Sequence, residues 1–124
     1  MKSKPLIVKK VPGKGRGVFA GKNFRKSEII ERCPILLVSE AERPQLNATA
    51  LHNYYFTWRR QAAIALGLGS LYNHSFVPNA RYLKVYSRSW IEIVAIRSIR
   101  KGEEITVNYN GRPNSRATLW FEVK

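Results

Sequence analysis

The chain of 124 residues is long enough for one domain with a modest core and too short for two. An apolar fraction of 44% argues against disorder, and no run approaches the roughly 18 apolar residues that span a bilayer. The formal charge of +14 is the strongest compositional signal, because a basic field of that size attracts polyanions, most commonly nucleic acid. The alternative is that the charge only keeps a small protein in solution.

Cysteine usage and the N-terminus narrow the class of protein further. Cys33 is the only cysteine, so neither an intrachain disulfide nor a cysteine-rich zinc site can form, and we predict no metal site. Residues 1–10 carry positive charge but too short an apolar stretch for a signal peptide. We therefore expect a soluble, intracellular protein, and a bacterial cytoplasm, a host nucleus and the role of a secreted effector are all compatible with the sequence.

Short strands dominate the predicted elements. Residues 6–8, 17–20 and 28–38 are predicted as strands, interrupted by Gly and Pro. Residues 89–96 alternate in part between apolar and polar side chains, as a half-buried strand does, and residues 104–108 form a further strand. No amphipathic pattern is long enough for a dominant helix. The predicted fold class is therefore mostly β with short helices.

One helical turn is predicted after the third of these strands. Ser39 is a good N-cap residue, and Glu40 and Glu42 suit the first turn of a helix. Pro44 is expected to limit how far that helix runs.

Two segments of the chain repeat one pattern. Residues 24–30 (FRKSEII) and residues 99–105 (IRKGEEI) both indicate a basic turn that leads into a strand. We interpret the repeat as shared turn chemistry and not as a duplicated domain.

Three further segments carry the candidate chemistry. Residues 13–20 (GKGRGVFA) contain a glycine turn, residues 72–79 (YNHSFVPN) join Asn-His-Ser to Pro-Asn, and residues 102–109 (GEEITVNY) end in Asn-Tyr. Each has a plain structural use, since Asn, Ser and Pro make turns and a lone Gly-x-Gly is weak evidence. Taken together and in this order, the segments resemble the SET-domain protein lysine methyltransferases.

The resemblance implies a SET-type fold of several small sheets with a C-terminal pseudoknot. It predicts that residues 1–124 form a single SET domain, with a motif-bearing core at about 8–109 and a closing tail at 110–124. The short chain and residues 65–69 (ALGLG) look most like the minimal stand-alone SET proteins of viruses and bacteria. Threading of a chain is rare among folds, and nothing in the periodicity of this sequence reveals it.

The same resemblance implies a site for S-adenosylmethionine. Backbone around Gly15, Arg16 and Gly17 would hold its methionine part, since glycines let backbone approach a ligand closely. The amide of Asn73 would hold the donor's amino group, and backbone at His74 would meet the adenine, with the His74 ring as an orienter and not a general base. The alternative for the glycines is a plain basic turn or an Arg/Gly contact with nucleic acid.

Tyr109 is the candidate for the central catalytic residue, and by the resemblance it also belongs to the cofactor site. A phenol with a pKa near ~10 is a poor base at neutral pH. Its expected role is therefore positional: its oxygen borders the transferring methyl and the lysine nitrogen and fixes in-line attack. Nearby sulfonium charge and desolvation both lower the pKa of the acceptor lysine, so no carboxylate base is required.

By the same resemblance, Tyr54, Tyr82 and Val107 are expected to line the channel for the substrate lysine. Tyr54 is the second catalytic candidate, although its aromatic segment, residues 53–58, is equally typical of core packing with phenol tips at the surface. A phenol at Tyr82 can hold a water that blocks further methylation, which favours monomethylation. Beyond the last motif, Trp120 is expected to cover the adenine as part of the cofactor site.

The predicted function is methyl transfer from S-adenosylmethionine to a lysine side-chain amine of a protein, such as a histone or another basic protein associated with nucleic acid. The alternative is a non-catalytic basic β module that binds nucleic acid or chromatin, which explains the charge but not the combination of motifs. The predicted partners are a protein with an exposed lysine, nucleic acid at the basic surface and a second copy of the chain, with no membrane. The sequence does not disclose the acceptor protein.

The charge of the chain raises a difficulty for a histone substrate. A free histone tail is itself basic, so long-range electrostatic steering opposes the encounter. Either the local groove is acidic, or the substrate arrives bound to nucleic acid, or the substrate is not a free histone tail.

Overall fold

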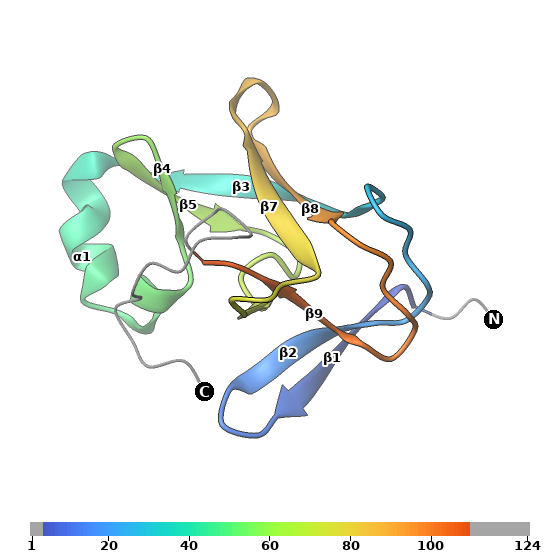
Figure 1. The fold of residues 1–124 in the computed structure, drawn as a ribbon. Coiled ribbons are helices and arrows are strands. Elements are labelled where there is room, and N and C mark those ends of the chain that lie inside the picture. Colours follow the sequence, from blue (N-terminus) through green and yellow to red (C-terminus); the bar gives the residue numbers. More distant parts are fainter. Residues whose placement is uncertain (1–3, 110–124) are drawn as a thin grey trace.

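Two sheets of short strands make up the fold in the computed structural model, which describes residues 4–109. The first sheet has the order β1-β2-β9-β6 and consists of β1 (Leu6–Val11), β2 (Gly15–Ala20), β9 (Glu104–Val107) and β6 (Asn73–His74). The second has the order β4-β5-β3-β8-β7 and consists of β4 (Phe56–Trp58), β5 (Gln61–Ala65), β3 (Ile29–Val38), β8 (Trp90–Ala95) and β7 (Ala80–Val85). Strand β9 passes beside β7, so the two sheets meet there (Figure 1).

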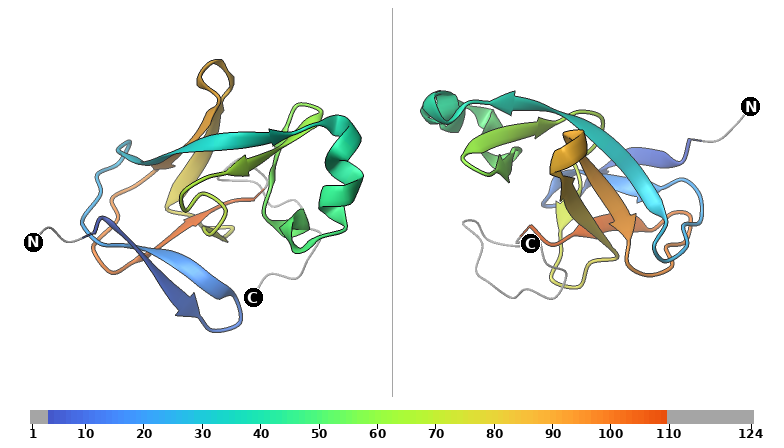
Figure 2. Two further views of the ribbon diagram at one scale, coloured as in Figure 1. Left: turned by 180° about the vertical axis from the view of Figure 1, so that it is seen from behind. Right: turned by 90° about the horizontal axis from the view of Figure 1, so that it is seen from above.

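The two ends of the molecule differ in character. The short helix α1 (Arg43–Asn47) lies near β4 and β5 at one end. The connections from β2 to β3 and from β8 to β9 lie together at the opposite end, as both views of Figure 2 and the view of Figure 1 show. Within residues 4–109, no helix is long and apolar enough to cross a membrane.

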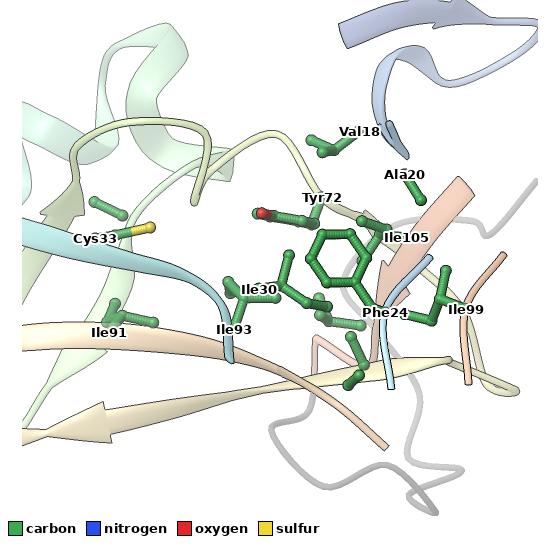
Figure 3. Packing of buried hydrophobic residues seen from close by; sticks show 14 of the residues in the cluster. Val18, Ala20, Phe24, Ile30, Cys33, Tyr72, Ile91, Ile93, Ile99 and Ile105 are labelled. Carbon is green, nitrogen blue, oxygen red and sulfur yellow. The ribbon is translucent and has the colours of Figure 1, made fainter. Parts of the chain in front are cut away.

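One hydrophobic core receives side chains from both sheets. Val18 and Ile105 of the first sheet and Ile91 and Ile93 of the second are all 0% exposed. Figure 3 shows Ile105 beside the ring of Phe24 and Ile91 farther away, on the side of Cys33. Burial of each such side chain stabilises the fold by roughly 1.5–3 kcal/mol. Alternate residues of β8 are buried, as the sequence pattern predicts. The fold class, mostly β with short helices, is confirmed, while the pseudoknot and the single-domain boundaries stay predictions.

The strand predicted at residues 28–38 forms as β3, and Pro34 does not interrupt it. Strand β3 continues through Pro34, which pairs with Trp90 at the start of β8. Up to Pro34 the strand pairs with β8, and from Ile35 onward it pairs with β5. Because Pro34 lies where β3 exchanges one partner strand for the other, its missing N–H costs little ladder hydrogen bonding.

The helical turn forms where it was predicted, but the role of the proline differs. The Glu42 carboxylate accepts hydrogen bonds from the Ser39 hydroxyl at 2.8 Å and from the Ser39 N–H at 3.4 Å, in the manner of a capping box. Pro44 does not end the helix. It occupies the first turn of α1, where no intrahelical N–H is needed and the fixed φ of proline suits a helix start.

Candidate active site

The parallel pairing of β6 with β9 brings the Asn-His-Ser segment against the C-terminal motif. Asn73 pairs with Thr106 and His74 pairs with Val107. Asn79, the last residue of the YNHSFVPN motif, also binds β9 through its side chain. It donates a hydrogen bond to the Glu104 carbonyl at 2.8 Å and accepts one from the Thr106 N–H at 2.9 Å. The Pro-Asn of the motif therefore fixes β9 beside β6.

Asn73 joins three strands through one side-chain amide. Its Nδ2 donates to Glu104 Oε2 at 2.7 Å and to the Arg16 carbonyl at 3.1 Å. Both bonds use the nitrogen, so within the described residues Oδ1 keeps its capacity to accept a hydrogen bond. The residue is only 9% exposed, which makes the direction of that oxygen well defined.

Gly15 and Gly17, on either side of Arg16, are needed for different reasons. A Cβ at Gly17 would lie 2.5 Å from Glu104 Oε2 and 2.8 Å from Asn73 Nδ2, so a side chain there would displace the pair. Gly15 has φ +78°, a conformation that L side chains rarely adopt, and a Cβ there would meet nothing within 4 Å. Gly17 is therefore required by packing and Gly15 by the turn. Arg16, between them, is exposed.

His74 supports the backbone of Tyr109. Its Nδ1 accepts a hydrogen bond of 2.9 Å from the Tyr109 N–H, so the neutral ring carries its proton on Nε2. Burial, with a smaller contribution from the charge of Lys14, lowers the pKa of His74. Nε2 is buried and has no hydrogen-bond partner among the described residues. The ring is thus held as a neutral orienter.

The Tyr109 hydroxyl is also fixed in direction. It donates a hydrogen bond of 2.7 Å to the carbonyl of Tyr72, which sets the direction of the phenol O–H. Burial, followed by the neighbouring Tyr54 and Glu104, raises the pKa of Tyr109 to about 12. The phenol is therefore neutral at physiological pH and cannot serve as a base.

Tyr109 borders a cavity of about 160 Å³. The lining comes from the segment before and within β4, from the loop before β6, and from β7 and β9. It consists of Tyr54, Tyr55, Phe56, Thr57, Gly69, Ser70, Tyr72, Tyr82, Lys84, Val107 and Tyr109. A cavity of about 150 Å³ accommodates benzene, so this volume suits a chain of five heavy atoms such as a lysine side chain.

The three predicted channel residues all line this cavity. Tyr82 donates a hydrogen bond of 3.2 Å from its hydroxyl to the Tyr109 carbonyl, and Val107 is 3% exposed. Tyr54 is 44% exposed and lies outside the hydrophobic core, against which Phe56 packs. The aromatic segment thus divides between the cavity and the core.

Lys84 is a cavity residue that the sequence did not reveal. It is half-buried on β7, two residues after Tyr82 and so on the same face of the strand. Burial lowers the pKa of its ammonium group. No Asp or Glu is among the described residues that line the cavity, so these residues do not form an acidic groove for a basic substrate.

Glu31 is a second residue that the sequence left without a role. It accepts hydrogen bonds from the Tyr72 hydroxyl at 2.8 Å and from the Leu68 N–H at 2.9 Å. It therefore anchors Tyr72, whose carbonyl holds the Tyr109 phenol. No local pattern predicts this contact, although the position of Tyr72 directly before Asn73 marks it as a neighbour of the motif.

The structure brings most of the predicted site residues into two adjoining groups. Gly15, Arg16, Gly17 and Asn73 lie at the junction of β2, β6 and β9, and the channel residues lie around the cavity at the end of β9. His74 and Tyr109 join the groups. Trp120 lies outside the described residues. Within residues 4–109 no group of three or more His, Cys, Asp or Glu is placed to hold a metal ion.

Comparison with known proteins identifies the family. Residues 15–110 match the SET domain. The histone-lysine N-methyltransferase of Schizosaccharomyces pombe that is specific for H3 lysine-37 is 34% identical over 120 residues, which cover 95% of this chain and 78% of that protein. The chain therefore belongs to the SET-domain family, and the predicted class of enzyme, a protein-lysine N-methyltransferase, is confirmed.

Other relatives are longer proteins. The N-lysine methyltransferase KMT5A-B of Xenopus laevis is 33% identical over 119 residues, which cover 83% of this chain but only 35% of that protein. The Set8 histone-lysine N-methyltransferase of Drosophila melanogaster is 32% identical, and the chain spans 18% of its length.

Solved structures share the fold. A Plasmodium falciparum protein proposed to be a histone methyltransferase superposes with a TM-score of 0.70 at 30% identity, covering 87% of this chain and 95% of that one. The Chaetomium thermophilum Polycomb Repressive Complex 2 bound to S-adenosylmethionine superposes with a TM-score of 0.73 at 24% identity, covering 91% of this chain and 16% of that one.

Proposed function

We propose that this chain transfers a methyl group from S-adenosylmethionine to the Nζ of a lysine in a histone or another basic protein associated with nucleic acid. The relatives named for histone-lysine methylation support the substrate class. The observation that carries the proposal is the position of Tyr109. Its neutral phenol, held by Tyr72 and His74, borders a cavity of a size that suits a lysine side chain.

The residues at the junction of β2, β6 and β9 fit the proposed cofactor. Asn73 Oδ1 is oriented and able to accept a hydrogen bond from an ammonium group, and the nearby Glu104 carboxylate favours positive charge. Because Gly17 has no side chain, the backbone at Arg16 and Gly17 lies close to Asn73 and Glu104. When bound there, S-adenosylmethionine supplies an electrophilic methyl group on a positively charged sulfur.

The chain's own residues would position the acceptor amine. The hydrogen bond from the Tyr109 hydroxyl to the Tyr72 carbonyl fixes the phenol in one position at the border of the cavity, where it can orient the acceptor amine. Aromatic faces of Tyr54 and Tyr82 suit an ammonium group entering the cavity. Exclusion of water then disfavours the charged form of the lysine and delivers the neutral amine.

Two partners belong to the proposal. Nucleic acid meets the basic surface of the chain and presents the protein substrate, which removes the difficulty that two basic proteins repel each other. A second copy of the chain buries apolar surface such as Leu36, which is 57% exposed. Sedimentation of the 124-residue chain tests the dimer, and a monomer at all concentrations contradicts it.

The first experiment is a calorimetric titration of S-adenosylmethionine into the chain and into Asn73→Ala. We expect specific binding that the substitution weakens by roughly 1.5–3 kcal/mol, the scale of a lost hydrogen bond to a charged group. A transfer assay with labelled methyl donor and histones follows, with Tyr109→Phe as the inactive variant. Tyr86→Phe, which changes an exposed phenol outside the cavity lining, serves as the control.

The outcomes distinguish a methyltransferase from a non-catalytic basic module. Donor binding together with methyl transfer supports the enzyme. Absence of any donor binding by the folded native chain contradicts it and favours the non-catalytic basic module. Donor binding without transfer to any histone keeps the cofactor site and contradicts the substrate class.

A further inference from the structure

The two repeated basic segments lie side by side in the structure. Phe24 and Ile99 form an antiparallel bridge in which each N–H donates to the other carbonyl, at 2.8 and 2.9 Å. The Lys101 N–H also donates to the side chain of Asn23 at 2.8 Å. The segments are 75 positions apart in sequence, so only the tertiary structure joins them.

The two turns are built in the same way. In each, the N–H of a glutamate donates at 3.0 Å to the carbonyl of the arginine three residues earlier, and the glutamate side chain accepts from that arginine's N–H at 3.0 Å. The third residue has a positive φ in both, 73° at Ser27 and 94° at Gly102, as in a type II turn. We call residues 25–28 and 100–103 the twin turns.

The bridge directs both arginines of the twin turns to solvent. Phe24 and Ile99 are 3% and 1% exposed, so their side chains point into the core. Successive side chains alternate across an extended pair, which turns Arg25 and Arg100 outward on one face. Residues related in this diagonal way have Cα atoms about 7–8 Å apart. The two exposed arginines therefore extend from neighbouring backbone positions.

The surface around the twin turns carries a large excess of positive charge. Residues 22–28 and 97–103 contain six Lys or Arg and two Glu. Of the six, only Lys22 forms an ion pair within residues 4–109, with Glu28 at 2.7 Å. The exposed Lys4 adds to this surface, because the Pro5 carbonyl accepts a hydrogen bond from the adjoining Gly21 N–H.

We propose that the twin turns are a docking surface for the phosphate backbone of nucleic acid. Arg25 and Arg100 contact phosphates of one strand, whose charges follow one another at about 3.4 Å along the axis. Lys26 and Lys101, next to them in each turn, add contacts that carry no sequence information.

The composition of the surface favours nucleic acid over a membrane. Peripheral membrane sites combine basic residues with apolar side chains that insert into the lipid. Here Phe24 and Ile99, which precede the twin turns, are buried and cannot insert, and of the apolar side chains in residues 24–30 and 99–105 only Ile29 is exposed, at 39%. The exposed side chains of the two turns are mainly charged, which suits a polyanion with regularly spaced phosphates.

One strand, β9, connects the turn at residues 100–103 to the cavity. The turn at residues 100–103 precedes β9 and Tyr109 follows that strand, so at about 3.3 Å per residue Glu103 and Tyr109 are at most roughly 20 Å apart. The turn at residues 25–28 precedes β3 and is joined to the other turn by the Phe24–Ile99 bridge. Figure 1 shows the two connections at the end of the molecule opposite α1. A basic protein that is bound to the same nucleic acid is thereby brought to the cavity, whose described lining residues include no Asp or Glu to attract it.

Fluorescence anisotropy with a labelled DNA duplex tests the surface, using the 124-residue chain without any methyl donor. The double variant Arg25→Gln/Arg100→Gln should weaken binding by on the order of tenfold or more and reduce the slope of log affinity against log salt by about 1.8, since each phosphate contact contributes about 0.9. The matched control is Arg60→Gln/Arg81→Gln, which removes two exposed arginines elsewhere with the same change in charge.

Each outcome decides the proposal. The proposal is supported if Arg25→Gln/Arg100→Gln loses DNA affinity and salt slope while the control does not. Lys26→Gln/Lys101→Gln should also lose affinity and salt slope. Equal losses in the control show a diffuse charge effect and contradict it. Absence of DNA binding, or binding to phosphatidylserine vesicles in its place, also overturns it. Because methyl transfer to a free peptide should be unchanged in the first variant, failure here is distinct from failure of the proposed enzyme activity.

Discussion

The backbone N–H of Tyr109 donates a hydrogen bond of 2.9 Å to Nδ1 of His74. Through this bond a residue of the Asn-His-Ser segment sets the position of the phenol that ends the last motif. Because Nδ1 must be unprotonated to accept, the charge state of His74 and the position of Tyr109 are coupled.

The first prediction concerns pH and stability. His74 has a lowered pKa in the folded state and an ordinary value of about 6.5 when unfolded, so near and below that value the unfolded chain binds more protons. The stabilisation is complete above about pH 6.5 and is lost as the pH falls from there through the lowered folded value. The free energy of unfolding, measured with urea between about pH 5.5 and 7.5, should therefore fall on acidification.

Two variants isolate the histidine responsible. His74→Gln removes this titration, so its stability should depend less on pH over that range, although it is destabilised by about 1–3 kcal/mol throughout. His52→Gln changes an exposed ring and should keep the full dependence of the native chain. Equal pH dependence in all three proteins would contradict the coupling.

The second prediction concerns the phenol of Tyr109. Tyr109→Phe should lower kcat by on the order of a hundredfold, the scale of a misplaced reacting group, with little change in the affinity for S-adenosylmethionine. Because the pKa of Tyr109 is raised to about 12, the native enzyme should not lose activity through phenol ionisation below about pH 10. Steady-state kinetics across pH measure both, and an unchanged kcat in the variant rejects the assigned role.

The third prediction contrasts two glycines two residues apart. Gly17→Ala should lower both stability and donor affinity, since its Cβ would displace the Asn73–Glu104 pair. Gly15→Ala should cost only about 1 kcal/mol of stability, because its positive φ is strained but its surroundings are open. Thermal unfolding and donor titration of both variants test the contrast. Equal effects would mean that the packing around Gly17 relaxes freely.

The fourth prediction concerns how many methyl groups are added. Tyr82→Phe removes a hydroxyl that lies in the cavity and donates to the Tyr109 carbonyl, which makes room near the acceptor nitrogen. Mass spectrometry of the product should show mainly monomethyl-lysine from the native enzyme and more dimethyl- and trimethyl-lysine from the variant. Mostly trimethyl-lysine from both proteins would rule out the role of Tyr82.

The fifth prediction concerns the charge in the cavity. Lys84→Met keeps much of the length of the side chain and removes a half-buried ammonium, so a basic peptide substrate should show a lower KM and a weaker response to salt. kcat should change little, because Tyr109 is untouched. An unchanged KM, measured at low salt where the repulsion is strongest, would show that Lys84 does not face the incoming peptide.

Local signals in the sequence determined the features that depend on neighbouring residues. The alternation in β8 and the Ser39–Glu42 cap rest on contacts within a few positions, and both formed as predicted. The order of the three motifs was enough to indicate the SET-domain family, which the match at residues 15–110 confirms. It also indicated the residues that gather at β6 and β9.

Tertiary pairing decided the rest. Strands β4, β5 and β7 have weak local patterns and form because partners lie beside them, and Pro34 fits a strand only because β3 changes partners there.

The physical reason is that the contacts that define the site are long-range. Gly17 must be glycine because Asn73 and Glu104 pack against it, and Glu31 reaches Tyr72 across 41 positions of sequence. The sequence by itself determined which residue types were present, in which order and with what charge. Only the folded chain determined which of them touch, because the energy of a close contact depends on which distant strands are paired.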